Sequence, residues 1–255
     1  MPVPRLVGLQ SGPASLTLVR HGQSVGNLAD AEARDQKADR LDLDVRDADV
    51  ELSDTGREQA EALRDWLKSA SEDERPDMVV SSPYRRAADT ARLATEGLGL
   101  EVAFDERLRE RDLGLFDGLT GQGIRSRYAD EAERRSKVGK FYYQPPSGES
   151  WADVVLRVRS LLADLRHGFD GARVWLFTHQ AVIMSYRYVL DGLSEDQLME
   201  IDRTSQIGNV SLSTYLRRNG GSLELDVFGD TSIVDARDAE VTAEPTVHDE
   251  ADADD

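Results

Sequence analysis

Short, mainly apolar runs recur along the first three quarters of the chain. Leu16–Val19, Met78–Val80 and Val174–Phe177 are each preceded and followed by polar residues. A run of this length is typical of a strand that is buried on both faces of a sheet. Further along, Val210–Leu216 and Leu223–Phe228 lie on either side of an asparagine–glycine pair at 219–220, which predicts a β-hairpin.

Stretches with helical periodicity separate these runs. Apolar residues at positions i, i+3, i+4 and i+7 predict a helix over Thr55–Ala70, and a second apolar stripe begins at Trp151. We expect another helix with Ser82 as its N-cap, Pro83 at its first position and Gly97 at its end. Residues 194–197 have the residue types of a capping box. This alternation predicts an α/β fold: a mostly parallel sheet with helices on both faces, which binds ligands at the carboxyl ends of its strands.

Two segments interrupt the alternation. Leu28–Val50 is highly charged, and Asp117–Ser147 combines glycines, a helical stretch of mixed charge and the aromatic pair Tyr142-Tyr143. Neither fits the strand–helix repeat, so we interpret both as insertions above the sheet. We expect the second, at about residues 117–147, to form a cap over the ligand-binding edge of the sheet.

Residues 230–255 differ in composition from the rest of the chain. They contain ten acidic residues and one arginine, and no aromatic residue follows Val234. A segment of this composition buries too little apolar surface to offset the conformational entropy lost on ordering. We therefore predict one folded domain over residues 1–229, with the insertion at about 117–147, and an acidic, disordered tail over residues 230–255.

Composition narrows the possible functions. The 255 residues include no cysteine and four histidines, which excludes disulfides, thiolate catalysis and cysteine-based metal centres. The net charge of −18 disfavours nucleic acid and anionic membranes as partners. No run approaches the ~20 apolar residues of a membrane helix, and no secretory signal is visible. We expect a cytoplasmic protein with neither a nucleic-acid nor a membrane partner.

Two histidines directly follow predicted strands. The first strand runs into Arg20-His21-Gly22, and the Val174–Phe177 strand is followed by Thr178-His179. Because the carboxyl ends of parallel strands meet at one edge of a sheet, both imidazoles should face the same crevice. A pair of hydrogen-bonded core histidines is the structural alternative.

Basic side chains begin the helix that follows the second strand. Arg85 and Arg86 lie near the positive end of the helix dipole, which costs ~0.3–1 kcal/mol that a bound anion would relieve. Helical spacing to Thr90 favours Arg86 as the side chain that faces the crevice. Since arginine binds phosphate through two N–H groups, the crevice is predicted to bind an anion.

Six motifs follow one another over roughly residues 15–216: Arg20–Asn27, Leu52–Ala60, Ser81–Ala91, Leu108–Gly114, Ser147–Ser150 and Thr178-His179. In this order they resemble the motifs of the histidine phosphatase superfamily, also called the phosphoglycerate mutase-like family. The resemblance implies that His21 is a nucleophile that forms a phosphohistidine. It also implies that Arg20, Arg86 and a cationic His179 bind the phosphoryl oxygens, and that Glu110 protonates the leaving oxygen and later activates water.

The resemblance assigns weaker roles to three other residues. Gly22 would let the backbone approach the ligand, and Asn27 would orient the phosphate, although a helix cap is an alternative role for Asn27. Gln180 stands where the family usually has glycine, and its backbone N–H would still point at phosphate. Asp112 and Asp117 are rivals of Glu110 for the role of general acid.

These residues favour a metal-independent phosphatase that hydrolyses small phosphate monoesters without a cofactor. Phosphoglycerate mutases of the family carry His-Tyr where this chain has Asp112-Leu113. A mutase also needs basic residues for a second phosphate, and the Asp117–Ser147 insertion offers Arg125, Arg127, Arg134, Arg135, Lys137 and Lys140. A mutase-type phosphotransferase and a catalytically silent phospho-ligand-binding protein are therefore the alternatives.

Overall fold

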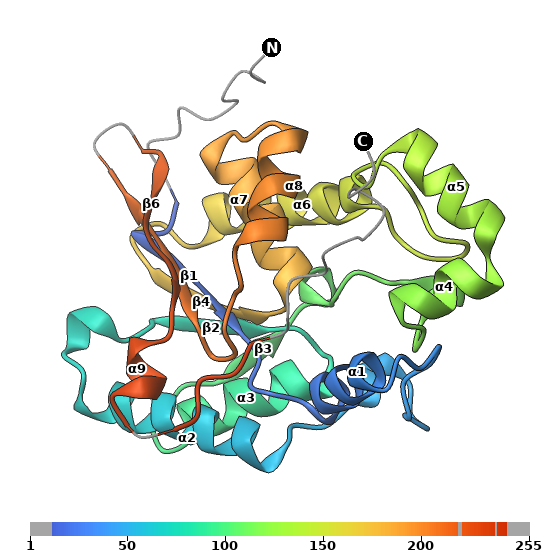
Figure 1. The fold of residues 1–255 in the computed structure, drawn as a ribbon. Helices are drawn as coiled ribbons and strands as arrows, with labels where there is room; N and C mark the ends of the chain where they lie inside the picture. The colour runs from blue at the N-terminus through green and yellow to red at the C-terminus, as the bar shows by residue number, and fades with distance from the viewer. Residues whose placement is uncertain (1–11, 219–220, 238, 244–255) are drawn as a thin grey trace.

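A six-stranded sheet lies at the centre of the computed structural model, which describes residues 12–218, 221–237 and 239–243 (Figure 1). The strand order is β3-β2-β4-β1-β5-β6. The first four strands in chain order are parallel, and the last two form an antiparallel hairpin along one edge. The strands are β1 (Ser15–Arg20), β2 (Met78–Ser81), β3 (Val102–Phe104), β4 (Arg173–Thr178), β5 (Leu212–Arg217) and β6 (Leu223–Asp230).

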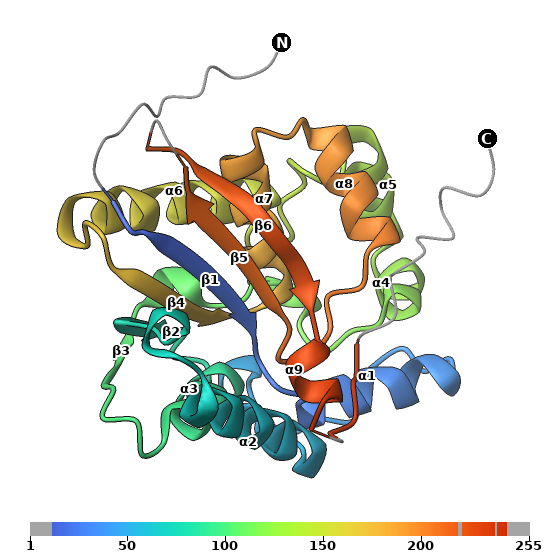
Figure 2. The same ribbon diagram turned by 90° about the vertical axis from the view of Figure 1, so that its left-hand side faces the viewer.

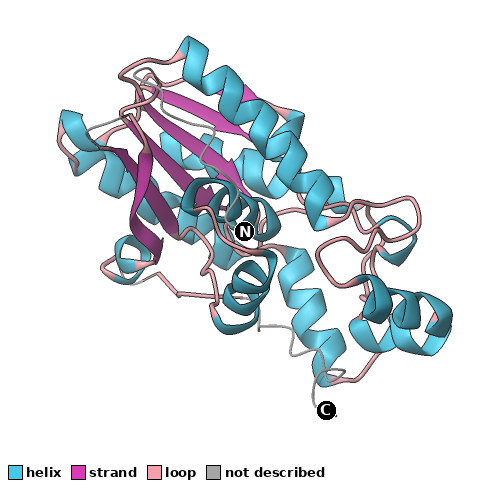
Figure 3. Cartoon of the chain, turned by 90° about the horizontal axis from the view of Figure 1, so that it is seen from above, coloured by secondary structure: helices cyan, strands magenta, loops and turns pink. Residues whose placement is uncertain are grey.

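Helices cover both faces of this sheet (Figure 1, Figure 2 and, from above, Figure 3). Leu16 and Leu18 of β1 belong to the apolar core on one face, whereas Val19 belongs to the core on the other. This alternation follows from the two-residue period of a strand. The first core packs against α6 (Trp151–Gly168), α7 (Gln180–Asp191) and α8 (Glu195–Thr204), and the second against α2 (Asp54–Ser69), α3 (Arg85–Thr95) and α9 (Ser232–Asp235). The predicted mostly parallel sheet with helices on both faces is confirmed.

The start of α3 differs from the prediction. The helix begins at Arg85, with Tyr84 as an N-cap that makes no side-chain hydrogen bond. Ser82 N donates to the carbonyl oxygen of Phe177 over 2.9 Å, which keeps residue 82 paired beside β4. The chain therefore leaves the sheet later than the sequence suggested, and the Ser82 hydroxyl is not a helix cap. The predicted stop at Gly97 is confirmed, since Gly97 adopts a φ of +77° just beyond the helix.

The two insertions meet beyond the carboxyl end of the sheet, at the right in Figure 1. Thr120 Oγ1 donates to the carbonyl oxygen of Ala38 over 2.7 Å, and Thr120 N donates to that of Asp39 over 3.1 Å. The sequence predicted a helical stretch in the second insertion, which is confirmed, and assigned no helix to the first. The first contains α1 (Val25–Asp35) with the short 3₁₀ turn η1 (Asp47–Asp49), and the second contains α4 (Gly121–Arg127) with α5 (Ala129–Val138).

Part of the predicted tail is ordered. Residues Ser232–Asp235 form α9, in which Ile233 and Val234 are buried against α2 and α3. Counting charge alone overlooked these two branched side chains, so the expectation of disorder is wrong for residues 230–237 and 239–243. The predicted hairpin between β5 and β6 is confirmed, whereas its turn at 219–220 and the tail residues 244–255 lie outside the described residues.

None of the helices in the described part of the chain combines the length and the apolar character that crossing a membrane requires.

A close backbone contact joins the start of α2 to the loop after β1, and it gives a test of the fold. A Cβ placed on Gly56 would lie 1.9 Å from the carbonyl oxygen of Gln23, so Gly56→Ala must push the two segments apart. We expect Gly56→Ala to lower the free energy of unfolding by about 2 kcal/mol or more. Gly168→Ala, at the end of α6 where a Cβ meets no atom within 4 Å, should stay within about 1 kcal/mol of wild type in the same urea titration.

Candidate active site

The predicted nucleophile lies in a tightly held loop at the carboxyl end of β1. His21 directly follows the strand, and 3% of its surface is exposed. Gly22 N donates to Thr90 Oγ1 of α3 over 2.9 Å, and a Cβ on Gly22 would lie 2.5 Å from the carbonyl oxygen of Gly56. Glycine at position 22 therefore lets the loop fit between α2 and α3, which fixes the position of His21.

The hydrogen bonding of His21 determines which nitrogen can react. Nδ1 lies 2.7 Å from the carbonyl oxygen of Gly22. Because a carbonyl oxygen only accepts, Nδ1 carries the proton of the neutral ring and Nε2 keeps its lone pair. Burial lowers the pKa of His21 well below its ordinary value of 6.5, and the positive charges of Arg86 and Arg20 lower this pKa further. His21 is therefore a neutral imidazole, the state in which a histidine acts as a nucleophile.

His179 lies beside His21. The centroids of the two rings are 5.1 Å apart, and His179 is fully buried at the N-cap position of α7. Its Nε2 lies 2.9 Å from Ser82 Oγ, and the same hydroxyl oxygen accepts a hydrogen bond from Tyr84 N over 3.2 Å. Burial, followed by the charge of Arg86, lowers the pKa of His179 well below 6.5. The structure thus gives a neutral His179, where the sequence analysis expected a cation.

The structure brings two buried arginines to the histidine pair. Arg20 is the last residue of β1, is 1% exposed, and donates from Nη1 to the carbonyl oxygen of Ile207. Arg86 lies in the first turn of α3, is 5% exposed, and has its guanidinium 5.4 Å from the centre of the Tyr84 ring. Arg85, by contrast, is half exposed and pairs with Glu51 over 2.5 Å. As predicted, Arg86 rather than Arg85 is the side chain directed into the protein.

A carboxylate that the sequence analysis did not single out binds Arg86. Asp47 Oδ1 accepts from Arg86 Nη1 over 2.9 Å, and Asp47 Oδ2 accepts from Nη2 over 3.2 Å. The backbone carbonyl of Asp47 also accepts from Nη1, over 2.7 Å. The only signal in the sequence was the high charge of the Leu28–Val50 insertion. This segment contains many acidic residues, and nothing in the sequence distinguishes Asp47 from the others.

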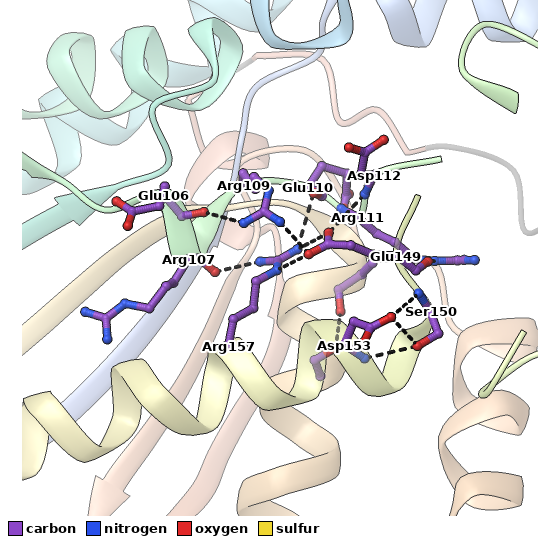
Figure 4. Close-up of polar contacts among 12 residues, drawn as sticks. Glu106, Arg107, Arg109, Glu110, Arg111, Asp112, Glu149, Ser150, Asp153 and Arg157 are labelled. Carbon is purple, nitrogen blue, oxygen red and sulfur yellow. Dashed lines mark hydrogen bonds and ion pairs between the residues drawn. The ribbon is translucent and has the colours of Figure 1, made fainter. Parts of the chain in front are cut away.

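Glu110 lies in a loop held by a network of arginines and carboxylates (Figure 4). Its Oε1 accepts from Arg111 N over 2.8 Å, and Arg157 Nη2 donates to its backbone carbonyl over 3.3 Å. Glu149 Oε1 accepts hydrogen bonds from Arg109 Nη2 over 2.5 Å and from Arg157 Nε over 3.1 Å. The glutamate of the Ser147–Ser150 motif therefore positions the loop that carries Glu110.

Asp117, one of the two rival acids, lies where burial and neighbouring charge favour its protonated form. Burial raises its pKa, and the negative charges of Asp47 and Asp112 raise this pKa further. Asp112 accepts a hydrogen bond from Gly114 N over 2.7 Å. The general-acid role of Glu110 stays a prediction from the resemblance, with Asp117 as its competitor.

Asn27 and Gln180 occupy helix starts near the site. Asn27 Oδ1 accepts from Ser24 N over 2.9 Å, and Asn27 N donates to Ser24 Oγ over 3.1 Å, which forms the capping box of α1. This is the helix-cap role that the sequence analysis set against phosphate binding. Gln180 is the first residue of α7 and is half-buried. Their contacts with phosphate stay predictions.

Hydrogen bonds from Asn209, Gln59 and Thr242 support the loop around His21. The sequence analysis missed them because it assigned Thr242 to the tail and gave the other two residues no role in the site. Asn209 Nδ2 donates to the carbonyl oxygen of His21 over 3.0 Å, and Asn209 Oδ1 accepts from Thr242 Oγ1 over 2.9 Å. Gln59 of α2 donates to Thr242 Oγ1 over 2.8 Å and accepts from Gln23 N over 2.9 Å. The loop is thus held on both sides of Gly22.

The described residues lack a set of ligands of the kind that metal ions need. Within residues 12–218, 221–237 and 239–243, no three histidine or carboxylate groups are placed to hold a metal ion together.

Comparison with known proteins matches this arrangement to a family. The model of the histidine phosphatase superfamily (branch 1) matches residues 16–231. The Mycobacterium tuberculosis bifunctional protein Rv2228c is 32% identical over 194 residues, which are 74% of this chain and 47% of that protein. This chain therefore spans about half the length of that relative.

Two other relatives represent different reactions. The 2,3-bisphosphoglycerate-dependent phosphoglycerate mutase of Allorhizobium ampelinum is 29% identical over 86% of this chain and 97% of its own length. A solved structure of the mycobacterial glucosyl-3-phosphoglycerate phosphatase Rv2419c with inorganic phosphate is 30% identical, with a TM-score of 0.67, and covers 87% of this chain and 99% of its own. The fold, the ordered motifs and the family match agree, and the chain belongs to the histidine phosphatase superfamily (branch 1).

Proposed function

We propose that the protein is a phosphatase that hydrolyses small phosphate monoesters through a phosphohistidine on His21. The observation that carries the proposal is the hydrogen bond from His21 Nδ1 to the carbonyl oxygen of Gly22, which leaves the lone pair on Nε2. Arg20, Arg86 and His179 surround this imidazole. His179 Nδ1 has no hydrogen-bonding partner among the described residues, and a phosphate oxygen would supply one.

In the first step, His21 Nε2 attacks the phosphorus atom and the bond to the ester oxygen breaks. The carboxyl of Glu110 gives its proton to that oxygen, so the product leaves as an alcohol. Arg20 and Arg86 together supply two positive charges to the equatorial oxygens, which carry the charge in phosphoryl transfer.

In the second step, water attacks the phosphorus atom of the phosphohistidine and the P–N bond breaks. The Glu110 carboxylate accepts the proton of the water, and the electron pair of the broken bond returns to Nε2. Inorganic phosphate leaves, and both His21 and Glu110 regain their starting protonation states.

The pairing of the basic residues in the second insertion supports hydrolysis over mutase chemistry. A mutase must hold a second phosphate, and at least four of the six candidate side chains have a carboxylate partner that the second phosphate would have to displace. Lys140 pairs with Asp202 over 3.2 Å, and Arg127 pairs with Asp39 over 3.3 Å. Lys137 likewise pairs with Glu133 over 2.6 Å, at an exposed site.

The proposed substrate class rests on the likeness to a known phosphatase. We propose a small phosphorylated metabolite in the cytoplasm, and the likeness to a mycobacterial glucosyl-3-phosphoglycerate phosphatase supports a phosphatase of this kind. The second insertion would act as the cap that contacts the leaving group.

The nucleophile assignment is tested with p-nitrophenyl phosphate, whose good leaving group places few demands on the leaving-group pocket. We expect turnover in the presence of EDTA and a loss of at least 1,000-fold (roughly, for a covalent nucleophile) in His21→Ala. His167→Ala, which alters an exposed histidine on α6, should retain wild-type activity. Turnover that survives in His21→Ala would exclude the phosphohistidine, and phosphate binding without turnover in wild type would indicate a binding protein.

The neutral histidines predict a pH dependence of stability. The pKa values of His21 and His179 lie below 6.5 in the folded protein and near 6.5 in the unfolded chain, so the unfolded chain binds more protons as the pH falls. Their contribution to stability is fully present above pH 6.5 and is lost below it, by up to about 1.4 kcal/mol per pH unit for each histidine. Urea unfolding at pH 7.5, 6.5 and 5.5 measures this slope. His21→Gln should reduce it and His167→Gln should not; an equal slope in all three proteins would contradict the prediction.

The general acid is identified by its dependence on the leaving group. We expect Glu110→Gln to slow hydrolysis of an alkyl phosphate such as glycerol phosphate by about 100-fold or more, because an alkoxide must be protonated as it leaves. With p-nitrophenyl phosphate, the rate of phosphoryl transfer to His21 should fall much less in Glu110→Gln, because nitrophenolate leaves without being protonated. Asp117→Asn is the matched comparison, and if it shows the leaving-group dependence while Glu110→Gln does not, the acid is Asp117.

A further inference from the structure

Asp47 binds Arg86, the arginine that the proposed reaction uses to bind phosphate. Its carboxylate binds Nη1 and Nη2 of Arg86 together, and these form one of the edges through which a guanidinium binds an oxyanion with two hydrogen bonds. The Arg86 side chain is 7% exposed and that of Asp47 is 39% exposed, so the contact lies where the site opens towards solvent. Asp47 thus stands in the position of an anionic ligand that belongs to the protein itself.

The charges of the site favour phosphate over Asp47. The two buried histidines are neutral, which leaves Arg20 and Arg86 as the positive groups around His21. A phosphate dianion matches these two charges. Asp47 would then be an unmatched negative charge beside the phosphate, in a region where Asp112 and Asp47 already raise the pKa of Asp117 by repulsion.

The segment that carries Asp47 has few attachments to the rest of the protein. Leu41 N donates to the carbonyl oxygen of Gly118 over 3.0 Å, and Val50 is buried, so the segment is anchored at both ends. Between these anchors, its backbone–backbone hydrogen bonds with other described residues lie within the turn itself, from Asp49 N to Arg46 and from Val50 N to Asp47. Asp47 can therefore leave Arg86 without unfolding a helix or a strand.

We infer that Asp47 is an internal competitor of the substrate: its carboxylate binds Arg86 until the phosphate group displaces it, and it thereby sets the affinity of the site for phosphate esters. The inference rests on the proposed function of Arg86 as a phosphate ligand. It differs from a role in which Asp47 merely orients Arg86, because the two roles predict effects of opposite sign when the charge of Asp47 is removed.

The test is the affinity of the full chain for inorganic phosphate, measured by isothermal titration calorimetry at pH 8 in wild type, Asp47→Asn and Asp49→Asn. The asparagine keeps the size of the side chain and leaves the bond from Arg86 to the backbone carbonyl of residue 47 in place. We expect Asp47→Asn to bind phosphate about tenfold more tightly, the order expected for removing one charge a few ångströms away in a partly solvated site. Asp49, in the same turn, pairs with the exposed Arg46, so Asp49→Asn should bind as wild type does.

Turnover of p-nitrophenyl phosphate separates the inference from the proposed function on which it depends. In Asp47→Asn the KM should fall by a similar factor while kcat is retained, and Asp47→Ala should behave in the same way. Phosphate affinity that is unchanged or weaker in both variants overturns the inference, as does a failure of every protein to bind phosphate. Tighter phosphate binding without turnover in any protein would support the role of Asp47 and contradict the phosphatase instead.

Discussion

The parallel pairing of β1 with β4 sets the geometry on which the site depends. In this register Arg20 lies opposite Thr178, so the next residue of each strand is a histidine. The two imidazoles therefore emerge side by side, with ring centroids 5.1 Å apart, although 158 positions separate them along the chain. A shift of this pairing by one residue would direct one histidine to the opposite face of the sheet. The buried branched and aromatic residues of both strands prevent that shift.

Burial and positive charge act on these histidines in the same direction. Both effects disfavour imidazolium, so the site holds two neutral rings beside two permanent cations. Arginine is suited to this environment because it stays charged where a histidine does not. The structure thereby separates the roles: the guanidinium groups supply charge, and the imidazoles supply a lone pair and hydrogen bonds.

The sequence allowed the fold and the centre of the site to be predicted, because both depend on short-range patterns. Apolar runs marked β1, β2 and β4, and the histidines stood directly at two of their ends. The role of Asp47 was not predictable, since it reaches Arg86 across 39 positions from a segment without periodicity. The predicted start of α3 was wrong because Ser82, which has the residue type of a helix cap, instead pairs through its backbone N–H with Phe177 of β4.

The segment around Thr242 shows the limit of composition as a guide to order. Residues 230–255 carry ten acidic side chains, yet one hydroxyl and two backbone carbonyls of this stretch make hydrogen bonds with Asn209 and Gln59, which are buried. One consequence concerns synthesis. The loop around His21 is translated 221 positions before Thr242, so its last hydrogen bonds form only after residue 242 has emerged. The support of the predicted nucleophile is therefore complete only when this distant segment has been made.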